Sequence, residues 1–184
     1  MIPGLIINTI GVFLGAILAF FTVRWQMSNQ GKRMLQKNNE LLCIHLERIK
    51  LELRDNRNTV NQLIETLENS NHSRRDIWEW GKTIVDAFSN QAHDDFLKSG
   101  IQRNLPVHIE KDTFYSYKKI EGLEHMVKQS SAGHDFVMGY SGDEVKADQL
   151  FNNTKTYART VSEYLEMTTK VIYEYYDKVE KQQR

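Results

Sequence analysis

Arg103 and His108 are a pair of residues whose types and spacing fit chemistry on a phosphate ester. Four residues separate them, in the segment Arg103-Asn104-Leu105-Pro106-Val107-His108. A His side chain moves protons near neutral pH, and an Arg guanidinium holds phosphate oxygens and stabilises the charge that develops on them. Asn104 adds an amide to the same segment. The three side chains are therefore the candidates for a functional motif.

Two features of this segment argue against catalysis. Pro106 lies between Arg103 and His108, so the two residues cannot share an unbroken helix. A chain with this many Arg and His residues is also expected to contain such a spacing by chance. A loop that joins two helices, with a capping His, is the simpler interpretation. We predict that the protein is not an enzyme, and that Arg103 and His108 act in structure or gating through an ion pair or a His hydrogen bond.

Other polar clusters predict no further site. His93-Asp94-Asp95 contains residue types that ligate metal ions, but no second cluster of such residues lies at a spacing that would complete a site. We therefore expect no metal and no cofactor. Arg74 and Arg75 precede Trp78 and Trp80, a mixture that RNA-binding proteins also use, although a solvated helix start explains it as well. The 24 Lys and Arg residues balance 24 Asp and Glu residues, which gives no global electrostatic reason to bind nucleic acid. Direct RNA binding stays open.

The N-terminal segment is apolar. Residues 1–23 contain no ionisable side chain, and a helix needs roughly 20 apolar residues to cross a bilayer. A cleaved signal peptide is disfavoured, because no basic residue precedes the apolar run. The sequence therefore predicts a transmembrane helix over residues 1–24 and a second domain over residues 25–184.

Charge near this segment predicts the orientation. Arg24, Lys32, Arg33 and Lys37 all precede the first acid, Glu40. The positive-inside rule then places the N-terminus outside and residues 25–184 in the cytoplasm of a single-pass protein of the bacterial inner membrane, with lipid as a partner.

Small and polar residues recur on one face of the same segment. Spacings of three and four residues align them, and such faces let membrane helices approach closely. We predict a homo-oligomer, a ring larger than a dimer, held by this small-residue stripe and by the long helix that follows. The stripe consists of Gly4, Asn8, Gly11, Gly15, Ala19 and Thr22.

The rest of the chain is predicted to be all-α. After a short stretch that contains Gly31, a heptad pattern predicts a long helix over residues 33–68. This seam could face the core of a bundle or another chain, and its two Asn residues could set the register or lie at a bundle edge. The seam consists of Leu35, Asn39, Leu42, Leu46, Ile49, Leu53, Asn56, Val60, Leu63 and Leu67.

Further helices complete a bundle of four or five. We expect helices over residues 76–88, 94–99 and 110–129, with either Trp78 or Trp80 buried by the first of these. A Gly- and Ser-rich loop is expected over residues 130–142. Ser141 and Glu144 have capping-box spacing at the start of a last helix, which is expected to end near Lys181.

The motif and the layout together resemble known proteins. Arg103, Asn104 and His108 resemble the R-x4-6-H signature of HEPN domains, helical bundles found in many RNases. The layout of the whole chain looks like that of the small accessory membrane proteins of type VI-B CRISPR–Cas systems. This resemblance implies a divergent HEPN-like bundle that forms a membrane pore, depolarises the inner membrane and enhances antiviral defence by an RNA-guided RNase.

Two other functions remain open at this point. One is a membrane-tethered HEPN ribonuclease that uses Arg103 and His108. The other is a single-pass coiled-coil scaffold whose heptad helix recruits a partner.

Overall fold

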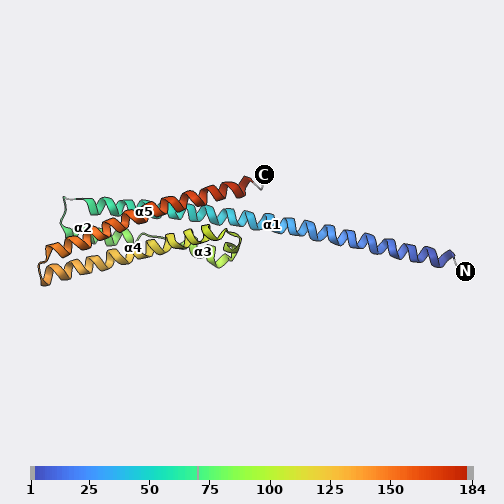
Figure 1. Cartoon of the computed structure of the whole chain (residues 1–184), viewed down its shortest axis with the longest axis horizontal. Coiled ribbons are helices and arrows are strands. Elements are labelled where there is room, and N and C mark those ends of the chain that lie inside the picture. The colour runs from blue at the N-terminus through green and yellow to red at the C-terminus, as the bar shows by residue number, and fades with distance from the viewer. Residues whose placement is uncertain (1–2, 70, 182–184) are drawn as a thin grey trace. The chain divides into compact units, whose positions relative to one another are not determined.

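The computed structural model describes residues 3–69 and 71–181, with side chains from Ile17 onward, and this part of the chain is entirely helical apart from its turns. The prediction of an all-α fold is confirmed, and within the described residues the helices form a bundle (Figure 1). The elements in chain order are α1 (Pro3–Glu68), α2 (Arg74–Val85), α3 (Gln91–Ser99), the 3₁₀ helix η1 (Ile101–Asn104), α4 (Val107–Tyr140) and α5 (Glu144–Lys181).

The chain divides into two compact units within α1. Unit 1 ends at Leu41 and unit 2 begins at Leu42. The expected break near Gly31 is absent from α1, which is continuous. A glycine inside a helix costs only about 1 kcal/mol relative to alanine, and no proline occurs there to interrupt the hydrogen bonds.

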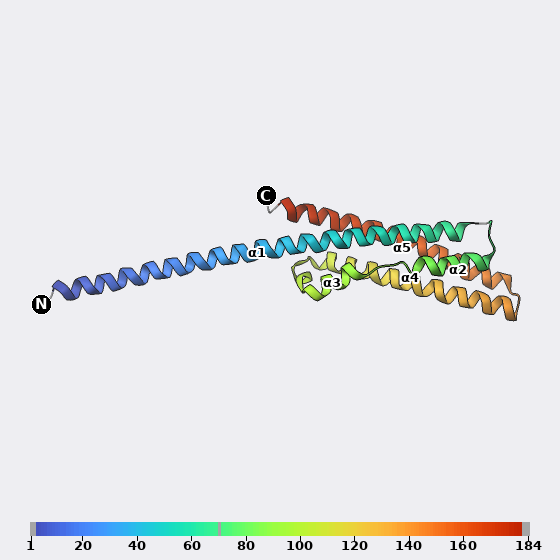
Figure 2. The same ribbon diagram turned by 180° about the vertical axis from the view of Figure 1, so that it is seen from behind.

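Unit 2 contains a hydrophobic core built by the C-terminal part of α1 together with α2–α5. The heptad seam is buried from Leu42 to Leu67, so the intramolecular interpretation is confirmed for that part. Leu35, in unit 1, is exposed. α4 and α5 form an antiparallel hairpin, and α2 lies along α4 (Figure 2).

Polar contacts join α1 to α5 outside this core, and one tryptophan is buried within it. Arg57 donates to Glu166 over 2.6 Å, and Ser162 donates to Asn61 over 2.7 Å. Trp78 is the buried member of the tryptophan pair, whereas Trp80 is exposed.

The expected loop over residues 130–142 is wrong, because α4 continues to Tyr140. Small side chains explain the continuation. Ser130 and Ser131 are buried, and the hydroxyls of Ser130 and Thr154 on α5 lie 3.0 Å apart. The Gly- and Ser-rich composition therefore permits close packing of α4 on α5 rather than a loop.

The start of α5 also differs from the capping-box prediction. The carboxylate of Asp143 accepts the backbone N–H of Lys146 over 3.1 Å. Ser141 instead donates its hydroxyl to the carbonyl of Val137, over 3.0 Å, at the end of α4. Asp143 is therefore the capping residue.

The predicted single-pass localisation in the bacterial inner membrane is corrected by the structure. Within the described residues, no helix has the length and apolarity that a bilayer span requires. From Ile17 the apolar run continues to Val23 and is then interrupted by Arg24, whereas a span needs roughly 20 apolar residues. Residues 1–16, where the predicted span begins, lie outside the described side chains.

Candidate functional site

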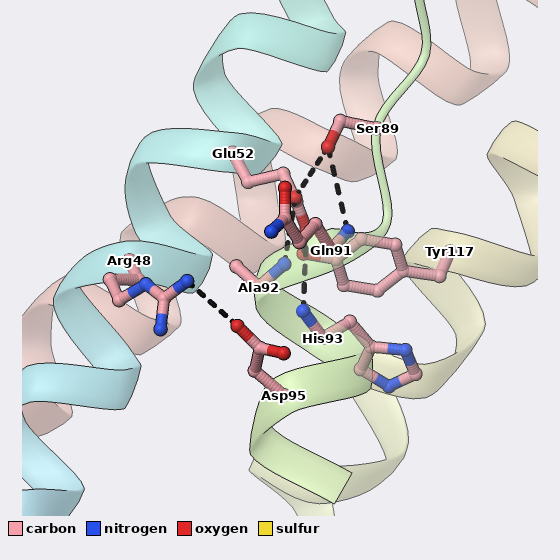
Figure 3. A network of polar contacts seen from close by, with 8 residues as sticks. All are labelled: Arg48, Glu52, Ser89, Gln91, Ala92, His93, Asp95 and Tyr117. Atoms are coloured by element: carbon pink, nitrogen blue, oxygen red, sulfur yellow. Dashed lines mark hydrogen bonds and ion pairs between the residues drawn. The ribbon is translucent and has the colours of Figure 1, made fainter. Parts of the chain in front are cut away.

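Glu52 of α1 is the centre of a polar cluster in unit 2 (Figure 3). Its Oε2 accepts the Ser89 hydroxyl over 2.7 Å and the backbone N–H of Ala92 over 2.9 Å. Its Oε1 accepts the Tyr117 hydroxyl over 2.6 Å and the backbone N–H of His93 over 3.4 Å. One carboxylate thus binds α1 to the start of α3 and to the N-terminal third of α4.

This carboxylate lies at the N-terminus of α3, where the first backbone N–H groups have no partner within the helix. A negative group is favoured there because it also faces the positive end of the helix dipole. Asn56, one turn further along α1, exchanges two hydrogen bonds with the backbone of Ser89, at 2.7 and 2.9 Å. The spacing of Glu52 and Asn56 therefore fixes where α3 begins.

His93 stacks on Tyr117 beside this carboxylate. Their ring centroids lie 4.2 Å apart at an interplanar angle of 14°. Burial lowers the pKa of His93, while the charges of Asp94 and Glu52 oppose the shift. Burial and the hydrogen bond to Glu52 raise the pKa of Tyr117. Both rings are therefore uncharged near neutral pH.

A groove between α3 and α4 opens beside His93. One part has a volume of about 380 Å³ and a second has about 300 Å³, and His93, Leu97 and Phe114 line both. His93 is only 7% exposed, and neither of its ring nitrogens makes a hydrogen bond within the described part of the chain. The ring can therefore donate or accept a hydrogen bond in the groove.

A second histidine lies near the same helix. The ring of His45 on α1 contacts Phe96 of α3, with centroids 5.8 Å apart. Burial and the nearby charge of Arg48 lower the pKa of His45. Arg48 also pairs with Asp95 over 2.8 Å at the surface. These contacts join α3 to α1 rather than forming a reactive centre.

The predicted motif lies at the junction of η1 and α4. Arg103 and Asn104 end η1, and His108 is the second residue of α4. All three side chains are exposed, and within the described residues neither Arg103 nor His108 makes a hydrogen bond or ion pair. The expected bond that would fix the helix angle is therefore not found there.

The small-residue stripe falls largely outside the described side chains. Gly4, Asn8, Gly11 and Gly15 lie outside them. Ala19 and Thr22 are exposed, and the Thr22 hydroxyl donates to the Leu18 carbonyl over 2.8 Å. Among the described residues, no group of three His, Cys, Asp or Glu side chains is placed to hold a metal ion.

Exposed apolar side chains lie along one side of the N-terminal part of α1, and we call them the methionine stripe. Its spacings of three, four, seven and seven residues place it along one helix face. Its side chains are between 39% and 69% exposed. The stripe consists of Phe20, Val23, Met27, Met34 and Leu41.

Sequence reasoning did not find Glu52, Ser89 or Tyr117. Asn56 carried a signal, since it interrupts the apolar seam of α1, but Glu52 lies among ordinary charged positions of a helix. Its partner Tyr117 is 65 positions away along the chain.

The chain matches no protein-family model, no curated protein and no solved structure. The chemistry of the site therefore rests on its geometry. All four hydrogen bonds of Glu52 hold protein groups in place. The arrangement therefore suits the positioning of α3 and α4, which form the walls of the groove, rather than proton abstraction by this carboxylate.

Proposed function

We propose that the protein is a self-associating helical scaffold, in which the bundle of unit 2 is assembled into homo-oligomers through the methionine stripe of α1. The observation that carries this proposal is the exposure of the five stripe residues. Large apolar side chains that recur exposed along one side of a helix mark an interaction site. Methionine suits such surfaces because its flexible side chain adapts to different partners.

The stripe belongs to unit 1, whereas the part of α1 that builds the core belongs to unit 2. The buried seam begins at Leu42, whereas the stripe lies on a different set of helix positions that ends at Leu41. Arg24, Lys32, Arg33 and Lys37 flank the stripe and are exposed. Basic residues beside exposed apolar helix positions are typical of segments that dock on a partner.

The test is the mass of the full chain in solution, measured by light scattering. We expect a mass well above the 21.6 kDa of one chain, in keeping with an oligomer larger than a dimer. Met27→Glu with Met34→Glu should reduce it to the monomer, because two charges enter the contact. Met138→Glu with Met167→Glu is the matched control, since these exposed methionines lie on α4 and α5.

Two outcomes would overturn this proposal. One is a monomeric wild type, and the other is an unchanged oligomer in the Met27→Glu, Met34→Glu variant. Flotation of a monomeric protein with phospholipid vesicles would also count against it, because the stripe would then contact lipid rather than protein.

A HEPN-like ribonuclease is the second candidate, favoured by the exposed and unpaired side chains of Arg103 and His108 within the described residues. Two copies could bring such side chains together. We expect no cleavage of single-stranded RNA by the purified protein, because Pro106 separates the pair. Cleavage that disappears in His108→Ala would establish the ribonuclease instead. The accessory role in RNA-guided antiviral defence remains a prediction of the resemblance.

A further inference from the structure

We propose that the methionine stripe of one copy docks in the groove between α3 and α4 of a second copy, so that the chains associate head to tail. This inference rests on the proposed function and adds the surface that receives the stripe. It begins with the groove, whose walls expose apolar side chains. Leu97, Val107, Phe114 and Tyr115 line it and are between 42% and 63% exposed.

The rim of the groove carries an excess of negative charge. Asp94, Glu110, Glu121 and Glu124 line it, against Lys111 and Lys118. Lys118 is paired with Glu121 over 2.6 Å, and Glu124 pairs with Lys128 over 2.8 Å. Asp94 makes no ion pair among the described residues, so negative charge remains at the part of the groove that it lines, whereas Glu110 is balanced by Lys111 in the other part.

The methionine stripe is accompanied by positive charge, which complements the negative charge of the groove. Four basic residues accompany it between positions 24 and 37, and no acid occurs before Glu40. An amphipathic helix lays its apolar face into an apolar groove through residues about seven positions apart, as Met27 and Met34 are. Opposite charges around such a contact fix its orientation and speed association.

Because the two surfaces differ, this contact is heterologous, and in a docked pair one copy keeps a free groove while the other keeps a free stripe. Repetition of a heterologous contact produces a closed ring or an open chain, whereas reciprocal docking of two copies would produce a two-fold dimer. Docking along successive copies therefore builds an oligomer larger than a dimer. A contact between two stripes would instead be satisfied in a dimer.

The test mixes two full-length variants, each blocked on one surface. Met27→Glu with Met34→Glu blocks the stripe. Leu97→Lys with Phe114→Lys blocks the groove by placing positive charge among its exposed apolar side chains. Each variant alone should be a monomer. Their mixture should give a one-to-one complex of twice the monomer mass, because each pair of chains contains only one intact groove and one intact stripe.

Controls separate misfolding from lost docking. Leu51→Lys with Met167→Lys introduces the same charges at exposed positions outside the groove and should keep the wild-type mass. Helicity and cooperative unfolding of each variant should match the wild type. Added salt should also dissociate the wild-type oligomer, because screening weakens the charge complementarity.

The outcomes distinguish this inference from the proposed function. A groove variant with the wild-type mass would overturn docking in the groove while self-association through the stripe stands. Monomeric variants whose mixture forms no complex would also overturn it. A stripe variant with the wild-type mass would overturn the proposed function itself.

Discussion

At the scale of single residues, Glu52 joins three helices through one side chain. Its carboxylate accepts four hydrogen bonds, from a tyrosine, a serine and two backbone N–H groups. Hydrogen bonds to a carboxylate are shorter and stronger than those between neutral groups. Loss of this acceptor leaves several donors without their partner at once.

We expect Glu52→Gln to lower the free energy of unfolding by about 2 kcal/mol, because the amide replaces one acceptor oxygen with a donor. Urea unfolding measures the change. Glu65→Gln, an exposed position of the same helix, is the control and should stay near the wild-type value. Equal stability of the two variants would show that the four bonds contribute little.

Stability should depend on pH through His93, which is buried, and His45, which is half-buried. Burial lowers the pKa of His93 and of His45 below the ordinary value of 6.5, so the unfolded chain binds protons more readily than the folded one. The stabilising contribution is complete above pH 6.5 and is lost as the pH falls from there toward the folded-state pKa values.

Thermal unfolding between pH 7.5 and pH 5 measures this dependence. We expect the midpoint to fall on acidification and the fall to be smaller in His93→Gln, which cannot titrate. An identical slope in wild type and variant would exclude His93 as a contributor.

At the scale of elements, α1 both builds the core and fixes its neighbours. The buried part of its seam, from Leu42 to Leu67, is apolar except at Asn56, which is 2% exposed and bonds the backbone of Ser89 in both directions. A polar residue inside a buried seam is tolerated because these bonds satisfy it. These bonds thereby hold the segment between α2 and α3 at a fixed position along α1.

We expect Asn56→Leu to destabilise the protein by about 1–2 kcal/mol despite its greater hydrophobicity, because the backbone groups of Ser89 lose their partners. Amide hydrogen exchange should rise at Ser89 and in the first turn of α3. Asn58→Leu, at an exposed position of α1, is the comparison. Faster exchange in both variants, or in neither, would contradict the role given to Asn56.

At the scale of the whole molecule, the hydrophobic core and the proposed assembly surface belong to different units. The core cluster runs from Leu42 to Ile172, which lies entirely in unit 2. The methionine stripe lies in unit 1. Folding of the bundle and the proposed self-association therefore involve separate sets of residues.

A fragment of residues 42–184 should consequently fold and unfold cooperatively, with a melting temperature within a few degrees of that of the full chain. It should also be monomeric. Circular dichroism and light scattering measure the two properties. A fragment without a cooperative transition would show that unit 1 contributes to the stability of the core.

Hydrophobic periodicity by itself determined the helical class and the inward face of α1 from Leu42 to Leu67. That pattern is local, since residues three and four positions apart share one helix face whatever surrounds the helix. Amino-acid composition predicted the secondary structure less well than periodicity did. The serines and glycines after residue 129 predicted a loop, yet they continue α4 because a small side chain such as that of Ser130 lets α5 approach closely.

Only the tertiary structure decided where the polar cluster lies and which tryptophan is buried. Trp78 and Trp80 are equally apolar, and the packing of α2 against α4 and α5 chose between them. Glu52 meets Tyr117 and the start of α3 because three helices converge at that point. Sequence spacing carries no information on such convergence, since hydrogen bonds between helices depend on how the helices pack rather than on the pattern within any one of them.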